Sequence, residues 1–404
     1  MATQSQTEFI PQPPPSLLEK AAITPPISKQ SYPKKKLVRR TDRDHSQAFR
    51  RSFQFAFLLL NVYLGATFYL WVRHFETNSR SKAAARPAGV EGWLPIAGLM
   101  NLKYWLLTRH VPDIHPAAMF LLLTFLAIAV LFRKAFCSWL CPVGTISEYL
   151  WRAGRKFFRR NFQLPLWLDI PLRALKYLLL GFFAWAVSTM SADAIAAFMR
   201  SPYGVIADVK MLNFFRFIGE TGIIVLALLM LASLFVQNFW CRYLCPYGAL
   251  LGLASLFSPL RIRRDASACV DCAKCAKACP SALPVDKLVT VKSAECTGCM
   301  DCVSACPAQG ALQMSVPVIW LGGQIAGLAP KNKTRQSALA RPQPRTISAT
   351  AMAAGIALLF FGIVGFAKTA GHWKTDVPNY VYRQLVPHAQ QAKHPIPGDP
   401  ALQN

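Results

Sequence analysis

The chain has 404 residues, of which 53% are hydrophobic and only 16% are charged. This balance is typical of a protein embedded in lipid, and the length leaves room for a soluble module as well. The net charge of +26 could indicate nucleic-acid binding, but the Lys and Arg residues cluster beside apolar stretches, as the positive-inside rule expects. We therefore exclude nucleic acid as a partner and interpret the chain as a membrane protein.

Residues 1–52 are predicted to form a disordered, basic cytoplasmic tail. This segment combines several prolines with the basic run Lys34-Lys35-Lys36. It lacks the early apolar region of a secretory signal, so we do not expect it to be cleaved.

Five apolar stretches follow, and they predict a membrane α-helical bundle of about five transmembrane helices. A spanning helix needs roughly 20 apolar residues. The second stretch is short, so we expect its helix to continue to Cys141 with Arg133 and Lys134 snorkelling. The stretches cover about 53–72, 117–132, 172–190, 222–239 and 347–366.

The distribution of basic residues predicts the orientation of these helices. If the N-terminus lies inside, the cytoplasmic segments 1–52, 133–176 and 240–346 hold most of the 45 Lys and Arg residues. We therefore expect a bacterial inner-membrane protein with a cytoplasmic N-terminus. Its C-terminal tail, residues 367–404, is then expected outside.

A short motif occurs twice between residues 53 and 260. Phe136-Cys-Ser-Trp-Leu-Cys-Pro-Val-Gly144 corresponds to Trp240-Cys-Arg-Tyr-Leu-Cys-Pro-Tyr-Gly248. Both copies follow an outside-to-inside helix, so we predict that a two-helix hairpin is used twice, as a parallel repeat about the membrane normal. The two cysteines of each copy stand at i and i+4, which predicts that they share one helix face.

This repeat is expected to bring four thiols together near the cytoplasmic surface. Four converging cysteines suit an additional iron–sulfur cluster or another soft metal, but also a dithiol redox relay. Buried packing is a further alternative, because free cysteine behaves as a small apolar residue. The four residues are Cys137, Cys141, Cys241 and Cys245.

Residues 261–320 contain two tandem copies of the bacterial ferredoxin motif Cys-x2-Cys-x2-Cys-x3-Cys-Pro. Three thiolates of each loop hold one 4Fe-4S cluster, and the fourth ligates the other cluster. Zinc sites favour paired Cys-x2-Cys motifs or mixtures with histidine, so this spacing disfavours zinc. The predicted ligands are Cys269, Cys272, Cys275 and Cys306 for cluster 1, and Cys296, Cys299, Cys302 and Cys279 for cluster 2.

The chain is thus predicted to insert an α+β two-cluster ferredoxin module into the bundle, followed by a cytoplasmic linker at 321–346 and the fifth helix at 347–366. No haem is expected, because the chain has no Cys-x2-Cys-His motif and its apolar stretches contain no histidine. The histidines at helix ends are expected either to be solvated or to take part in quinone binding or proton transfer. They include His74, His110, His115 and His372.

The order of these parts resembles the NapH/NosR-type family of membrane-bound 4Fe-4S ferredoxin proteins. The resemblance covers about residues 50–320 and rests on Gly89-Val-Glu-Gly-Trp-Leu-Pro-Ile96, the two Cys-x3-Cys-Pro repeats and the double cluster motif. NapH-like proteins move quinol electrons towards periplasmic nitrate reductase, and CcoG-type oxidase assembly proteins share the plan. NosR-like proteins bear a large flavin-binding domain for which this chain lacks space, so the closer likeness is to NapH.

Together these features predict an electron-transfer component of an oxidoreductase system, rather than a stand-alone enzyme. Its clusters would exchange electrons with quinone or with a redox partner protein in the membrane or periplasm. The alternative is an assembly or maturation factor that reduces a metal or a disulfide for a respiratory metalloenzyme.

Overall fold

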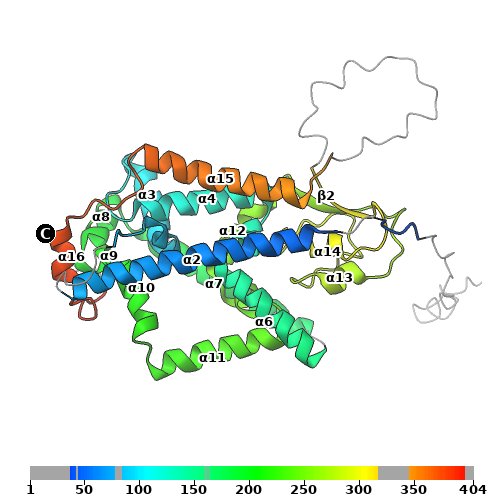
Figure 1. Cartoon of the computed structure of the whole chain (residues 1–404), viewed down its shortest axis with the longest axis horizontal. Helices are drawn as coiled ribbons and strands as arrows, with labels where there is room; N and C mark the ends of the chain where they lie inside the picture. The colour runs from blue at the N-terminus through cyan, green and yellow to red at the C-terminus, as the bar shows by residue number, and fades with distance from the viewer. Residues whose placement is uncertain are drawn as a thin grey trace, which may run out of the picture.

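The computed structural model describes residues 37–41, 44–77, 84–159, 162, 164–316 and 345–395. Helices α2, α4 and α15 run along the long axis, with a small cysteine-rich module at one end and helix α16 at the other (Figure 1). The helices are α2 (Ser46–Glu76), η1 (Ala88–Trp93), α3 (Pro95–Thr108), α4 (Pro116–Phe132), α5 (Ala135–Trp139), α6 (Pro142–Phe158), α7 (Leu166–Thr189), α8 (Ala192–Arg200), α9 (Pro202–Val205), α10 (Ala207–Arg216), α11 (Glu220–Phe235), η2 (Trp240–Leu244), α12 (Pro246–Ala254), η3 (Ser255–Phe257), α15 (Ala349–Thr369) and α16 (Asn379–Leu385).

Each of the five predicted apolar stretches forms a helix, but not all of these helices are long. Within the described ranges, α2, α7 and α15 are long and apolar enough to cross a membrane. A fourth span results if α10 and α11, which meet at 82°, count as one bent span. Helix α4 has 17 residues and α11 has 16, which is short of the roughly 20 that a span needs.

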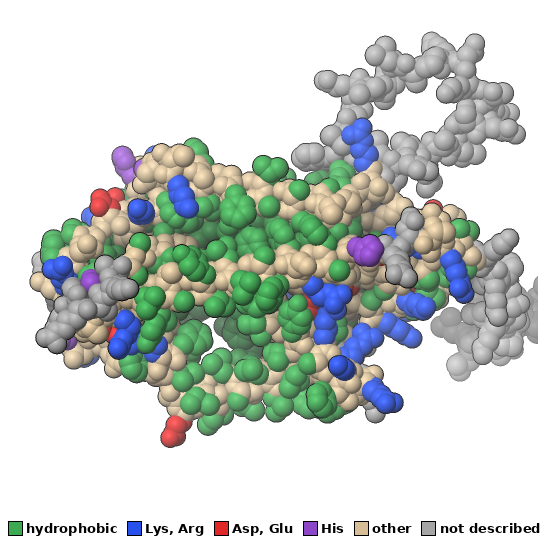
Figure 2. Space-filling model, viewed as in Figure 1, with side chains coloured by type: hydrophobic (Ala, Val, Ile, Leu, Met, Phe, Trp, Pro, Cys, Tyr) green, Lys and Arg blue, Asp and Glu red, His purple; other side chains and the backbone are tan. Residues whose placement is uncertain are grey.

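Apolar side chains cover the outside of the helices. Tyr63 on α2, Leu178 on α7 and Leu358 on α15 are all strongly exposed, as side chains that face lipid are. Figure 2 shows hydrophobic side chains along much of the visible face, while many Lys and Arg side chains gather near α6 and the cysteine-rich module. The protein is therefore a mostly helical membrane protein.

Helix α4 forms the centre of the bundle. It is apolar on all sides and packs against α3, α12 and α15, which is why Ala117, Ile128 and Ala129 are fully buried. Its N-terminus lies near η1, and its C-terminus meets the cysteine-rich module.

The cysteine-rich module is a small α+β unit, as predicted. Its three antiparallel strands lie in the order β1-β2-β3, with Ile262 opposite Met314. Its elements are β1 (Arg261–Arg264), α13 (Lys274–Ala278), α14 (Asp301–Ser304), β2 (Leu312–Val316) and β3 (Arg345–Thr346). Strand β3 lies within the predicted linker 321–346, so that end of the linker belongs to the sheet; residues 317–344 lie outside the described residues.

Two predicted boundaries are wrong. Helix α2 begins at Ser46, so residues 46–52 are helical rather than part of a disordered tail; residues 1–36, with the basic run Lys34-Lys35-Lys36, lie outside the described residues. Helix α4 ends at Phe132 instead of continuing to Cys141.

The break after α4 has a clear physical cause. Arg133 adopts φ 64°, which ends the helix, and its side chain is fully buried rather than snorkelling. Its guanidinium donates hydrogen bonds to the carbonyls of Ser255 (3.3 Å) and Ser293 (2.6 Å). These carbonyls come from later parts of the chain and hold the arginine inside the protein.

Candidate iron–sulfur sites

The predicted ligands of cluster 2 lie together inside the module. Cys279, Cys296, Cys299 and Cys302 line one small cavity. Next to Cys299, Gly298 has φ +65°, which lets the backbone curve around the cavity. The four thiols are supplied by both motif copies, which is the arrangement that a bacterial-type cluster needs.

The predicted ligands of cluster 1 lie nearer the surface. The Cys306 thiol is close enough to Cys269 and Cys272 to interact with them electrostatically, and Cys275 also faces Cys306. Cys272 is exposed, whereas three ligands of the other set are buried. The division of ligands between the clusters remains a prediction, but each predicted set is brought together in space.

Buried thiols of this kind fit a positively charged partner. Burial raises the pKa of the Cys279 thiol to about 11. A buried cysteine therefore becomes a thiolate only when a cation such as iron replaces its proton. Bound clusters would supply reversible one-electron transfer, while the polypeptide holds them and excludes water.

The two Cys-x3-Cys-Pro motifs have the same local geometry at their second cysteine. Cys141 is the N-cap of α6 and Cys245 is the N-cap of α12, each followed by proline at the first helical position. The backbone N–H of Gly144 donates to the Cys141 sulfur (3.5 Å), and that of Gly248 donates to the Cys245 sulfur (3.2 Å). Both sulfurs thus lie at helix N-termini, whose N–H groups stabilise a thiolate. At Cys141 burial outweighs this effect and raises the pKa of the thiol to about 11.

The predicted shared helix face is wrong. Cys137 lies in α5 and Cys241 in the π-helix η2, so the chain breaks between the two cysteines of each pair. Proline at the first helical position favours this break. Gly144 permits the close approach, because a Cβ atom there would lie 2.2 Å from the Cys137 carbonyl oxygen.

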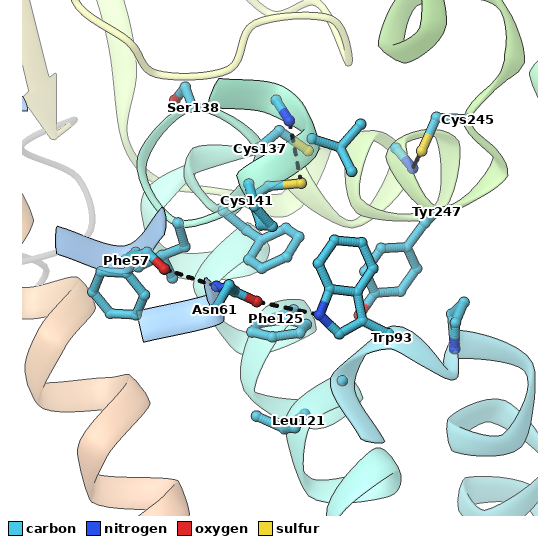
Figure 3. Close-up of a pocket in the computed structure, with 18 of the residues that line it drawn as sticks. Phe57, Asn61, Trp93, Leu121, Phe125, Cys137, Ser138, Cys141, Cys245 and Tyr247 are labelled. Atoms are coloured by element: carbon cyan, nitrogen blue, oxygen red, sulfur yellow. Dashed lines mark hydrogen bonds between the residues drawn. The ribbon is translucent and has the colours of Figure 1, made fainter. Parts of the chain in front are cut away.

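The four helix-end cysteines nevertheless converge. Cys137, Cys141, Cys241 and Cys245 line one cavity of about 740 Å³. Figure 3 shows Cys137 and Cys141 on one side of this cavity and Cys245 on another, with Tyr247 below Cys245 in this view. Burial raises the pKa of the Cys137 thiol to about 12, and negative charge at Cys141 and Cys245 adds to the rise.

The described residues contain no group of three or more His, Cys, Asp or Glu side chains placed to share a single metal ion. A 4Fe-4S cluster differs from such an ion, because its four thiolates bind four different iron atoms.

Buried charged residues surround the helix-end cysteines, a role that the sequence did not predict. Lys134 lines the cavity, and its ammonium lies 3.8 Å from the Glu295 carboxylate. Burial alone would lower the pKa of Lys134, but negative charge at Cys137 and Glu295 raises it above its usual value. The sequence contains one sign of this role. Lys176 lies inside an apolar stretch, where an ionisable residue usually has a partner and a function.

A second charged network fastens the module to the bundle. Arg50 of α2 is fully buried and binds Glu148 of α6 through both carboxylate oxygens (2.8 and 2.6 Å). It also contacts Asp301 of α14 at 3.4 Å, and Arg152 contacts both acidic residues. Two cations therefore face two anions where helices and module meet.

The cavity extends from the cysteines towards the other end of the bundle. Its apolar walls include Phe57, Leu121 and Phe125, and the indole N–H of Trp93 donates to the Asn61 side-chain oxygen (3.2 Å) within it (Figure 3). Arg86 lines the far end. The cavity is thus mostly apolar, with a few polar groups.

A third charged network lies at that far end. Arg86 contacts Glu91 at 2.8 Å and Asp208 at 2.6 Å, and His115 lies 3.3 Å from Glu91. His115 is fully buried, so it is not a solvated histidine. Burial alone would lower its pKa, but the neighbouring Glu91 carboxylate raises it above the usual value. The Thr375 hydroxyl donates to Glu91, which ties the C-terminal segment to this network.

Comparisons with known proteins agree with this arrangement. The 4Fe-4S binding domain family matches residues 114–165 and 218–264, which contain the two Cys-x3-Cys-Pro motifs, and the 4Fe-4S dicluster domain family matches residues 261–307. The chain is 48% identical to YccM of Escherichia coli, named an electron transport protein, over 87% of this chain and 94% of YccM.

Other relatives share smaller parts of the chain. The ferredoxin-type protein NapH of Escherichia coli is 26% identical over 55% of this chain and 71% of NapH. The regulatory protein NosR of Pseudomonas aeruginosa is 32% identical over 40% of this chain, which corresponds to 22% of NosR. No solved structure gives a significant match.

Proposed function

Since the chain belongs to the NapH/NosR-like family of membrane-bound 4Fe-4S proteins, we propose that it passes single electrons between its ferredoxin module and a second redox partner reached through the helical bundle. That partner is quinone or a redox protein of the membrane or periplasm. The module and the N-terminus would face the cytoplasm, and the C-terminus would lie outside the inner membrane.

One observation carries this proposal: the cysteine sites follow one another from the surface into the bundle. The predicted ligands of cluster 1 include the exposed Cys272, whereas three predicted ligands of cluster 2 are buried. Cys299, a predicted ligand of cluster 2, also lines the large cavity with the four helix-end cysteines. Electrons could therefore move by short steps between adjacent sites.

The cavity supports quinone as the partner. Its volume of about 740 Å³ falls within the roughly 300–1,000 Å³ that is usual for small-molecule sites. The Asn61 amide donates one hydrogen to the Phe57 carbonyl (2.8 Å), which leaves its second hydrogen for a ring carbonyl, and the indole N–H of Trp93 holds the Asn61 oxygen. Phe57 and Phe125 offer apolar surface. Quinone needs two electrons and two protons to become quinol, so two successive transfers would complete one turnover.

The test uses full-length, anaerobically purified protein in lipid nanodiscs with oxidised clusters. A quinol is added, and cluster reduction is followed by EPR. We expect Asn61→Leu to slow reduction several-fold, because one hydrogen bond contributes roughly 0.5–1.5 kcal/mol. Thr67→Val, on the same helix but outside the cavity, should leave the rate unchanged.

Absence of any electron exchange with quinol, in protein that retains its EPR signals, would contradict the quinone proposal. Loss of cofactor from a partner metalloenzyme in cells without this protein would then favour the alternative, a maturation factor that reduces a metal or a disulfide. Lack of iron in the purified protein would overturn both.

A further inference from the structure

The helix-end cysteines lie beside an excess of buried positive charge. Lys134 and Lys176 both contact one carboxylate, Glu295, at 3.8 Å and 2.5 Å. Lys176 is fully buried and Lys134 is 3% exposed. Glu295 directly precedes Cys296, so the two lysines reach from the helices to the ferredoxin module.

A second group on the same side of the cavity repeats this excess. Arg173 and Arg242 both contact one carboxylate, Asp169, and both line the cavity. Arg242 directly follows Cys241. The Nε atom of Arg173 is buried and has no hydrogen-bond partner among the described atoms.

Four cations therefore face two anions around the cysteine end of the cavity. Cys299, a predicted ligand of cluster 2, also lines the cavity, and its charge is counted with the ferredoxin module. The other charged side chains that line the cavity do not correct this excess. Glu148 is paired with Arg50 and Arg152, and Arg86 is paired at the far end. Lys368, whose ammonium lies 5.9 Å from the Trp373 ring, would only add positive charge. Lys134, Lys176 and Arg242 are largely buried, whereas the Arg173 side chain is 28% exposed. Buried charges without partners are costly, so the excess calls for an anionic occupant.

We propose that Cys137, Cys141, Cys241 and Cys245 hold a 4Fe-4S cluster as four thiolates, and that Lys134 is the positioning residue that supplies its counter-charge. An oxidised 4Fe-4S core carries two positive charges and its four thiolates carry four negative ones, so the centre is a dianion. This charge equals the local excess of two cations. The inference rests on the proposed electron-transfer function and adds a third centre to it.

The backbone around the cysteines fits the same occupant. The N–H groups of Gly144 and Gly248 point at two of the four sulfurs, and hydrogen bonds to cluster sulfurs are a usual feature of such sites. Neutral thiols or disulfides would leave the excess charge without a partner. A single divalent ion with four thiolates has the same charge, so the iron content has to decide between the two.

The experiment measures iron, acid-labile sulfide and EPR-monitored redox titrations on full-length protein in nanodiscs. The wild-type protein should contain about twelve iron atoms, and Cys137→Ser/Cys241→Ser about eight, since each cluster holds four. Lys134→Met should shift the midpoint potential of the third centre to lower values, because reduction adds negative charge that the lysine no longer offsets. Lys134→Arg should restore the potential.

The signals of the two ferredoxin clusters report whether each variant is folded. Lys374→Met removes a lysine that lines the same cavity and is the matched control. If Lys134→Met retains its ferredoxin signals but loses only the third centre, the proposed role is also supported. A potential equal to that of Lys374→Met would overturn the role of Lys134.

Eight iron atoms in the wild-type protein would overturn the third cluster. If quinol still reduces that protein, the proposed function would stand without it. Zinc in place of the third cluster's iron would likewise overturn the inference.

Discussion

Cations outnumber carboxylates at one end of the helical bundle, whereas carboxylates outnumber cations at the other end. At the ferredoxin end, four cations face two carboxylates beside the helix-end cysteines. At the other end, Arg86 alone faces the carboxylates of Glu91 and Asp208. Each excess needs a counter-charge: an anionic cofactor at the cysteines, and a proton on His115 at the far end.

A network with equal charges lies between these cases. Arg50 and Arg152 face Glu148 and Asp301, and their contacts link α2 and α6 with α14 of the module. Nothing further is needed to neutralise it. The network of equal charges joins the helices to the module. The other two networks each carry a net charge that a bound cofactor or a proton has to neutralise.

Removing one cation from the equal network should have the largest effect. Arg50→Met leaves Glu148 and Asp301 buried with only Arg152, and breaking such a buried pair costs about 3–5 kcal/mol. We expect a corresponding fall in the free energy of unfolding, measured by denaturant unfolding in detergent. Arg51→Met removes the neighbouring exposed arginine and is the control. Equal losses in both variants would contradict a joining role.

The sequence predicted the features that depend on local spacing. The five apolar stretches form helices, and the predicted ligands of each cluster lie near one another, while their division between two clusters stays a prediction. Cys141 and Cys245 occupy equivalent N-cap positions, as the matching Cys-Pro-x-Gly segments suggest.

The sequence did not predict features that depend on distant partners. Arg133 was expected to snorkel, yet carbonyls of Ser255 and Ser293 bury it, and both lie more than a hundred residues away in sequence. The same holds for Glu295, whose two lysines come from α7 and from the N-cap of α5. Helical periodicity also placed Cys137 and Cys141 on one face, whereas the proline after Cys141 begins a new helix.

A smaller effect on the free energy of unfolding is expected for a substitution at the cysteine end of the cavity. Glu295→Gln removes one of only two anions, so Lys134 and Lys176 depend more on the proposed cluster. We expect the substitution to destabilise Cys137→Ser/Cys241→Ser protein more than wild-type protein, with a coupling of about 0.5–3 kcal/mol. Unfolding of the four proteins in detergent gives this coupling, with ferredoxin EPR signals as the check on Cys296. Strictly additive effects would argue against an anionic occupant.

The smallest effect concerns the proton at the far end. His115 faces Glu91, Asp208 and Arg86, and its raised pKa means that the folded protein binds a proton more tightly than the unfolded chain. This stabilisation is fully present below the unfolded value of about 6.5 and is lost as pH rises through the folded pKa.

His115→Asn should reduce the fall in thermal stability on raising pH, since asparagine tolerates the φ of 54° at this position but does not titrate. His110→Asn, at an exposed histidine, should keep the wild-type pH profile. If His115→Asn and the wild-type protein lose stability in parallel as pH rises, the excess negative charge at this end is not neutralised by His115.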